Sequence, residues 1–285
     1  MRAAALGGVC ACGLVLAAGL AAAGSTGETG ETRADSGAGW GQRTYPSAKQ
    51  LASAREYAAG RSSSVAFAVI GPGAGARGIG VDTQFSSASV SKALLLAGYL
   101  RSHKGEIDAG TRSQLEAMVT ASDNSAADAI YAIVGDEGME RVAQRAGMDD
   151  FEATPGFWGG VQITAADMAR FFFRLDHNLA GPHRRYGKRL LASVIEPERW
   201  GIPVAAGKGW RIWFKGGWRP GGDEENSSGP VSHQAALLRY RNGVEVAICV
   251  LSHEAPGEGG GYTTIEGIAS RLIDPPPRSG RWPAS

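Results

Sequence analysis

Apolar residues in the first third of the chain change from a helical to a strand-like period. From Ser47 to about Ala59 they recur every three or four positions, which predicts an amphipathic helix. Residues 64–70 are almost continuously apolar and are followed by Gly71-Pro72-Gly73, so we expect a buried strand that ends in a turn. A second strand is predicted over 77–81.

Helical patterns fill the centre of the chain. One helix is predicted through Ser89 to about His103, and a longer stretch from 111 to about 146 is interrupted at 122–124. Residues 154–160 contain one proline and three glycines, which predicts a loop. A capping-box-like start at 164–167 then introduces a helix over 168–175.

The last third returns to strands. Three are predicted, over 210–214, 231–240 and 244–252, and Asn242-Gly243 predicts a hairpin between the last two. A helix over 263–273 follows. This order predicts an α/β (α+β) fold, in which both ends of the chain form an antiparallel five-stranded sheet flanked by helices, with an inserted all-helical lobe.

Composition divides the chain further. Residues 1–23 are typical of a signal peptide, with Arg2, an apolar run and a small-residue end at 21–23, so a secreted or cell-envelope protein is expected. A single N-terminal membrane anchor is the alternative. The expected divisions are a flexible linker (24–45), a domain (46–274) with a sheet lobe (46–85 and 205–274) and a helical lobe (86–204), and a disordered tail (275–285).

Composition also limits the partners. The 285 residues carry a formal net charge of +1, which does not favour nucleic acid. The five histidines have no metal-ligand spacing, so we expect no metal and no cofactor. His233 is expected to be a packed strand residue, and we expect a monomer. Signal cleavage would leave Cys249 as the only thiol and therefore no internal disulfide.

Three short motifs carry candidate chemistry. Ser89 and Lys92 are three residues apart and share one helix face, and Lys92 is the only lysine with a serine at that spacing. A lysine with a lowered pKa can take the proton of a serine hydroxyl. Ser122-Asp123-Asn124 precedes an apolar helix, and Lys215-Gly216-Gly217 ends the strand predicted over 210–214. Alternation along that strand places Trp210 and Phe214 on one face and Trp213 on the other.

Each motif has a structural alternative: a capping serine with a solvated lysine, a helix N-cap, and a strand end with a glycine turn. In the order Ser-x-x-Lys, Ser-Asp-Asn, Lys-x-Gly, however, they form a serine acyl-transfer signature. With them, the chain from about Ser47 to Ile273 resembles the class A β-lactamase family of penicillin-recognising serine hydrolases. The stretches 163–169 and 261–269 add to this resemblance.

The resemblance implies a β-lactamase/transpeptidase-like fold and a role for each matching residue. Ser89 is implied as the acylated nucleophile, Lys92 as its general base and Ser122 as the proton relay to the leaving nitrogen. Asn124 is implied to bind the substrate amide and to brace Lys92. Lys215 is implied to attract the substrate carboxylate. The backbone N–H groups of Ser89 and Trp218 are implied as the oxyanion hole beside Gly216 and Gly217.

The sequence departs from the family pattern at three places. Gly216 stands where a hydroxyl residue is usual, and Ser232 is a candidate replacement. The segment between Lys92 and Ser122 is shorter than usual. The loop before Thr164 is also short, although Phe151-Glu152 resembles the family's aromatic-Glu pair. Glu152 is therefore either the base that activates the deacylating water or an exposed loop acid.

The sequence thus predicts a secreted active-site-serine hydrolase. Its expected substrate is a small β-lactam or a D-alanyl-peptide-like amide, opened through an acyl-enzyme on Ser89. Two alternatives remain. One is a penicillin-binding DD-peptidase or esterase with slow deacylation, and the other is a cell-envelope binding protein that has lost turnover.

Overall fold

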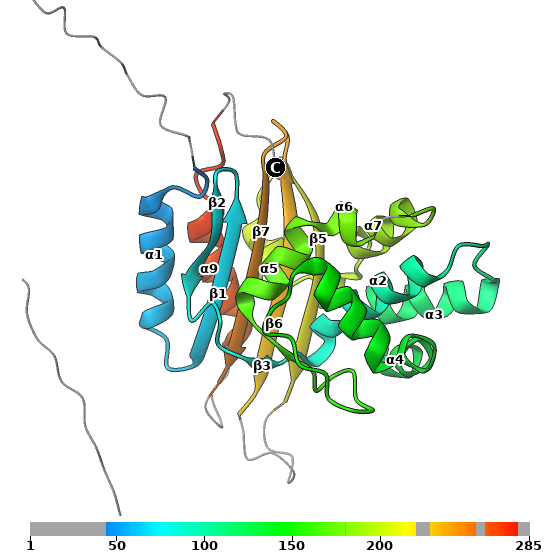
Figure 1. Ribbon diagram of the computed structural model, residues 1–285. Helices are drawn as coiled ribbons and strands as arrows, with labels where there is room; N and C mark the ends of the chain where they lie inside the picture. Colours follow the sequence, from blue (N-terminus) through cyan, green and yellow to red (C-terminus); the bar gives the residue numbers. More distant parts are fainter. Residues whose placement is uncertain (1–43, 180, 221–228, 255–259, 279–285) are drawn as a thin grey trace, which may run out of the picture. The chain divides into compact units, whose positions relative to one another are not determined.

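A computed structural model describes residues 44–179, 181–220, 229–254 and 260–278 (Figure 1). Its helices and strands, in chain order, are α1 (Ala48–Ala59), β1 (Ser64–Gly71), β2 (Ala74–Ile79), β3 (Phe85–Ser86), the 3₁₀ turn η1 (Ala88–Ser91), α2 (Lys92–Ser102), α3 (Ala109–Thr120), α4 (Asn124–Ala146), β4 (Gln162–Ile163), α5 (Ala165–Phe173), α6 (Leu175–Asn178), α7 (Arg184–Ala192), the 3₁₀ turn η2 (Glu196–Glu198), α8 (Ile202–Ala205), β5 (Trp210–Arg219), β6 (Val231–Tyr240), β7 (Glu245–His253) and α9 (Gly261–Ile273).

Strands from both ends of the chain form one antiparallel sheet. The order is β2-β1-β7-β6-β5, so β7 lies at the centre and β5 at an edge (Figure 1). Phe67 of β1 pairs with Val250 of β7, and β7 pairs with β6 through the turn at Asn242 and Gly243. The predicted five-stranded antiparallel sheet is therefore confirmed, and so is the α+β fold class.

Helices cover both faces of the sheet, which explains why its strands are apolar at successive positions instead of alternating. Helices α1 and α9 lie on one face and α5 on the other, next to the remaining helices (Figure 1). Phe67, Val69 and Phe214 belong to the core under α1 and α9. Trp213 belongs to the opposite core, so the predicted division of the two aromatic residues 213 and 214 between the faces is confirmed.

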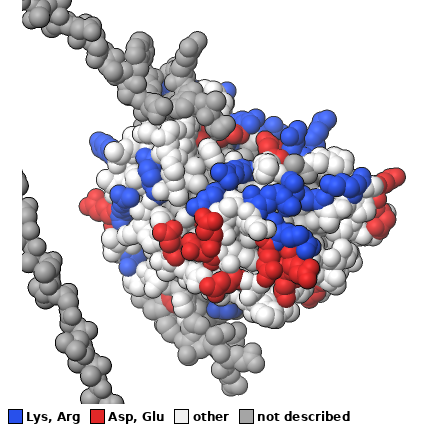
Figure 2. Space-filling model, viewed as in Figure 1, with Lys and Arg blue, Asp and Glu red and all other residues white. Residues whose placement is uncertain are grey.

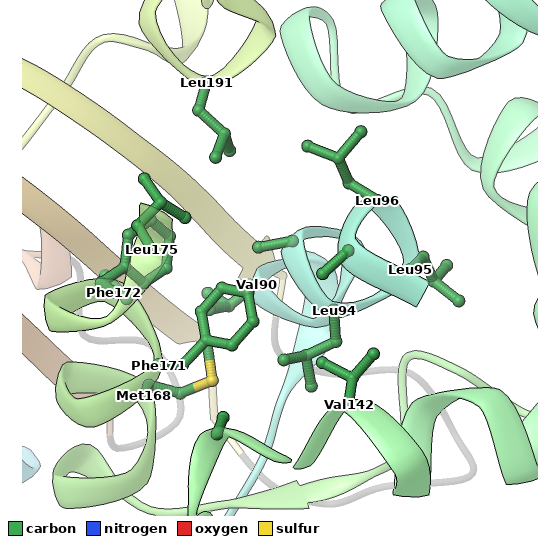
Figure 3. Packing of buried hydrophobic residues seen from close by; sticks show 14 of the residues in the cluster. Val90, Leu94, Leu95, Leu96, Val142, Met168, Phe171, Phe172, Leu175 and Leu191 are labelled. Carbon is green, nitrogen blue, oxygen red and sulfur yellow. The ribbon is translucent and has the colours of Figure 1, made fainter. Parts of the chain in front are cut away.

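The second core surrounds α2, the helix that continues from the turn carrying Ser89. Leu94, Leu95 and Leu96 are all fully buried, which requires neighbours around most of the helix. Phe171 of α5 and Val142 of α4 belong to the same cluster (Figure 3). Close packing of this kind fixes the direction and depth of α2, and with them the start of the helix.

Local sequence signals set several helix starts as predicted. Ser47 caps α1, and its hydroxyl accepts from the Gln50 N–H in a complete capping box. Asp123 caps α4 by accepting from the Ala126 N–H at 2.7 Å. Thr164 caps α5 by accepting from the Asp167 N–H at 3.1 Å. Each cap satisfies backbone donors that the first helical turn leaves unpaired.

The structure differs from the predicted elements at several places. Ser89 lies in η1, and the regular helix begins only at Lys92. Strand β2 is displaced toward the turn, to Ala74–Ile79. Strand β5 does not end before Lys215 but continues to Arg219, because its pairing with β6 outweighs the low strand preference of glycine. The sequence interpretation also missed α7, which buries Leu190 and Leu191.

The two ends of the described domain are hydrogen-bonded to each other. The Tyr45 hydroxyl donates to the Ile273 carbonyl at 2.8 Å, and the Gln50 amide donates to the Leu272 and Pro275 carbonyls. These contacts extend by one residue beyond each predicted domain boundary, 46 and 274. The predicted signal peptide (1–23), most of the predicted linker and residues 279–285 of the predicted tail lie outside the described residues.

Surface charges of both signs are grouped on the face shown in Figure 2, where a band of Lys and Arg lies beside clusters of Asp and Glu. Lys188 pairs with Asp176 at the surface, whereas Arg170 pairs with the buried Asp167. A helix long and apolar enough to span a membrane is not found within residues 44–278 where they are described.

Truncation of Leu94 tests whether this core positions α2. Leu94→Ala should lower the free energy of unfolding by about 2–5 kcal/mol, because it removes a fully buried side chain and leaves a cavity. The exposed Ile133→Ala is the control, with an expected change within about 0.5 kcal/mol. Urea unfolding measures the free energy of unfolding of both variants. Equal losses in the two variants would show that Leu94 does not stabilise the core.

Candidate active site

A strained turn presents Ser89. The Ala88 N–H donates to the Gly159 carbonyl at 3.0 Å, and the Lys92 N–H donates to the Ser89 carbonyl, so Ser89 and Lys92 share one turn. Ala88 has φ of +45°, a left-handed conformation that costs energy for a residue with a Cβ. Such conformations persist where surrounding contacts enforce them, and they gather at functional sites. Ser89 itself is partly exposed.

His233 holds the approach to this turn against the sheet. Its Nδ1 accepts from the Ser252 N–H at 3.1 Å, so Nε2 carries the proton and donates to the Ser86 carbonyl at 3.1 Å. Phe85 meets the ring edge to face at 5.7 Å between centroids. Burial lowers the pKa of His233 to about 4 and keeps it neutral. The prediction that His233 is a satisfied packing residue is confirmed, and its contacts fix the strand that leads to Ser89.

Lys92 is buried among oxygen acceptors. Its Nζ donates to the Asn124 Oδ1 at 2.7 Å, to the Ser122 carbonyl and, at 3.4 Å, to the Ser122 hydroxyl. Ser122 has φ of +59°, and in this conformation both of its oxygens face Lys92. The predicted bracing of Lys92 by Asn124 is thus present in the structure.

Lys215 reaches the same hydroxyl from the sheet. Its Nζ donates to the Ser122 Oγ at 2.9 Å and to the Gly216 carbonyl at 2.7 Å, and its side chain is buried. The Ser122 hydroxyl therefore lies between two lysine amines from different parts of the fold. A hydroxyl in that position can pass a proton to or from either neighbour.

Burial is the main cause of an unusual acidity in both lysines. It lowers the pKa of Lys92 to about 8, against the opposing charges of Asp123, Glu198 and Asp128. Burial and, to a smaller extent, the neighbouring charge of Lys92 together lower the pKa of Lys215 to about 7. Near neutral pH about half of the Lys215 amines and a smaller fraction of the Lys92 amines are therefore unprotonated and able to accept a proton.

Strand β5 passes so close to the Ser89 turn that only glycine fits at 217. A Cβ on Gly217 would lie 2.7 Å from the Ser89 nitrogen and 2.8 Å from the Val90 nitrogen. A Cβ on Gly216 would lie 2.9 Å from the Trp200 ring, on the opposite side of the strand. The absence of a hydroxyl at 216 therefore has a structural cause, since the indole of Trp200 fills that space.

Sequence reasoning assigned no role to Trp158 and Asp128. The Trp158 ring is buried and lies 4.8 Å from the Lys92 Nζ, a cation–π distance. Its indole N–H donates to the Asp128 Oδ1 at 2.7 Å, which fixes the ring. Trp158 belongs to the short loop that precedes Thr164, and the aromatic residues of that loop were the available signal.

Two further predicted substrate-binding residues, Trp218 and Ser232, lie opposite each other on strands β5 and β6. Trp218 extends β5 and its side chain is 49% exposed. Ser232 pairs with Trp218 across the sheet, but its hydroxyl is buried and bonded to Glu254 at 3.3 Å. Ser232 thus lies near the site with its hydroxyl already engaged. Among residues of the described ranges, no group of three or more His, Cys, Asp and Glu is arranged to hold a metal.

The structure does not bring Glu152 into the lysine cluster. Its backbone forms a bridge with Gln162, and its exposed side chain lines a surface cavity of about 570 Å³. The other walls of that cavity include Asp136, Glu140 and Met148 of the α4 region. The geometry therefore favours the alternative of an exposed loop acid.

Comparison with known proteins agrees with this arrangement. The model of a family described as the β-lactamase enzyme family matches residues 111–275, a range that includes Ser122 and Lys215 and begins after Ser89. The chain belongs to the β-lactamase enzyme family. The predicted family resemblance is thereby confirmed. No curated protein matches the chain.

Solved structures share the fold at low sequence identity. A β-lactamase from Sphaerobacter thermophilus DSM 20745 has a TM-score of 0.62 and 17% identity, over 79% of this chain and 95% of that one. PBP-A has a TM-score of 0.65 and 15% identity, over 81% and 96%. A class A β-lactamase from Mycobacterium abscessus has a TM-score of 0.64 and 15% identity, over 79% and 98%. At these identities the likeness shows the β-lactamase fold alone.

The coupled lysines of this β-lactamase-family site can be titrated directly. In NMR spectra of ¹⁵N-lysine-labelled protein, we expect midpoints of about 7 for Lys215 and about 8 for Lys92. Lys92→Met should raise the Lys215 midpoint, because it removes a neighbouring positive charge that favours loss of the Lys215 proton. Lys104→Met, on the exposed surface, is the matched control. Midpoints near 10.5 for both amines would contradict this picture.

Proposed function

We propose that the protein is a serine hydrolase that opens β-lactam or D-alanyl-peptide-like amides through an acyl-enzyme on Ser89. The observation that carries the proposal is the hydrogen-bonded series Lys92–Ser122–Lys215, one turn from a partly exposed serine. Membership of the β-lactamase enzyme family supports the reaction class.

In the proposed acylation each of these groups has one role. Neutral Lys92 takes the proton of the Ser89 hydroxyl while the Ser89 oxygen bonds to the carbonyl carbon of the substrate. The Ser89 and Trp218 N–H groups stabilise the resulting oxyanion, which we place at the closest approach of the turn and β5. When the C–N bond breaks, Ser122 donates its proton to the leaving nitrogen and regains one from the neighbouring lysines. Asn124 binds the amide side chain of the substrate.

A specific observation supports slow deacylation as the second candidate, that of a penicillin-binding DD-peptidase. Hydrolysis of the acyl-enzyme needs a base to activate water. The predicted base, Glu152, lines a separate surface cavity, while Trp158 of the same loop region lies against Lys92. On this view the acyl-enzyme forms readily and persists.

Labelling with benzylpenicillin tests the nucleophile. Ser89→Ala should abolish the covalent adduct, and Lys92→Ala should slow its formation by about 10²–10⁴-fold through loss of the general base. Ser125→Ala and Lys104→Ala, both at exposed positions, are the controls and should acylate normally. Intact mass spectrometry follows the adduct, and peptide mapping to any residue other than Ser89 would refute the assignment.

The fate of the adduct tests Glu152. Because Glu152 lies outside the lysine cluster, Glu152→Ala and the wild type should lose the adduct at the same rate, within about twofold. Glu140→Ala, in the same surface cavity, is the matched control. A pulse with benzylpenicillin followed by mass spectra over time measures the loss. A longer-lived adduct in Glu152→Ala alone would make Glu152 the base and favour a β-lactamase.

A further inference from the structure

The segment from Ile195 to Trp200 spans the candidate site from one side to the other. At its start, the Ile195 N–H donates to the Thr120 carbonyl at 3.1 Å, two residues before Ser122. At its end, the Trp200 ring fills the space beside Gly216 and stacks on Tyr262 at 4.0 Å between centroids. Glu198 lies between these two anchors in the chain, on a segment that runs from the end of α3 to strand β5.

Glu198 acts electrostatically on both lysines. Its charge opposes the lowering of the pKa of Lys92 and of Lys215, and it raises the pKa of Tyr262. Its Oε2 is buried and has no hydrogen-bond partner among the described residues. A buried carboxylate oxygen left without a donor is costly, so this position suits a ligand that supplies one.

The groups that would bind a substrate carboxylate are missing or engaged. Gly216 has no side chain, and Trp200 prevents one. Ser232 is 5% exposed, and its hydroxyl is hydrogen-bonded to Glu254. The Nζ of Lys215 remains, but it already donates to the Ser122 Oγ and the Gly216 carbonyl. A carboxylate arriving here would therefore meet few free donors and the like charge of Glu198.

We propose that Glu198 makes this site select acyl-transfer substrates with a hydrogen-bond donor on the leaving-group side, such as a carboxamide or an ammonium, over substrates with a carboxylate there. The inference rests on the proposed acyl-enzyme function, since it concerns the substrate of the same site. A donor would satisfy the orphaned Glu198 oxygen, whereas a carboxylate would be repelled by it.

Two probes that differ only at this group provide the test. Acylation of the full chain by benzylpenicillin and by its carboxamide, in which CONH₂ replaces the ring carboxylate, is followed by intact mass spectrometry. The wild type should react faster with the carboxamide. Glu198→Gln should react about tenfold faster with benzylpenicillin than the wild type does, with the carboxamide rate changed less than about twofold. Glu196→Gln, two residues away with a 91% exposed side chain, is the matched control and should behave as wild type.

Noncovalent binding separates this inference from the proposed function. Calorimetric titration of Ser89→Ala, and of the same protein with Glu198→Gln added, compares the two probes without any acylation. If Ser89→Ala binds the carboxamide more tightly and Glu198→Gln removes this preference, the subsite is supported. This holds even if the wild type forms no adduct, a result that would refute the acyl-enzyme proposal alone. Any of four results would overturn the inference. Three concern binding to Ser89→Ala: equal binding of the two probes, tighter binding of benzylpenicillin, or no measurable binding. The fourth is slower adduct loss in Glu198→Gln without a change in probe preference.

Discussion

Two buried lysine amines donate hydrogen bonds to one serine hydroxyl. The rest of the site depends on the groups that offset the cost of burying these amines. A buried amine is costly as a cation unless oxygen atoms surround it. Here the oxygens come from Asn124, from both oxygen atoms of Ser122 and from the Gly216 carbonyl. The remaining cost appears as the lowered pKa of each lysine, which is the property that general-base chemistry needs.

The two adjacent glycines of β5 meet different constraints. Gly217 allows a strand edge to approach the Ser89 turn, where any side chain would collide with backbone nitrogens. Gly216 faces the opposite way and makes room for Trp200, whose segment carries Glu198. The glycine at 216 and the carboxylate of Glu198 are therefore linked through a single aromatic ring, that of Trp200.

The sequence allowed the sheet, most helices and the lysine–serine cluster to be predicted, because caps, hairpin signals and motif spacing are local features. It did not reveal Trp158, Asp128 or Glu198, since only tertiary contacts bring these distant positions to Lys92. Glu152 looked suitable because it follows an aromatic residue, but pairing of its backbone with Gln162 directs it elsewhere. Strand β5 was predicted too short because glycine is a poor strand former in isolation, whereas β6 supplies a partner for each residue.

The strand order has a consequence for how the chain can assemble. The strand β7 is the last to be synthesised, yet it occupies the middle of the sheet and is the only link between the β1–β2 pair and the β5–β6 pair. Without β7, the described strands of this sheet would be two separate antiparallel pairs, each with an open edge that could pair with another chain. Completion of this sheet therefore needs non-local pairing, and a chain truncated before β7 would lack the strand that joins the two pairs.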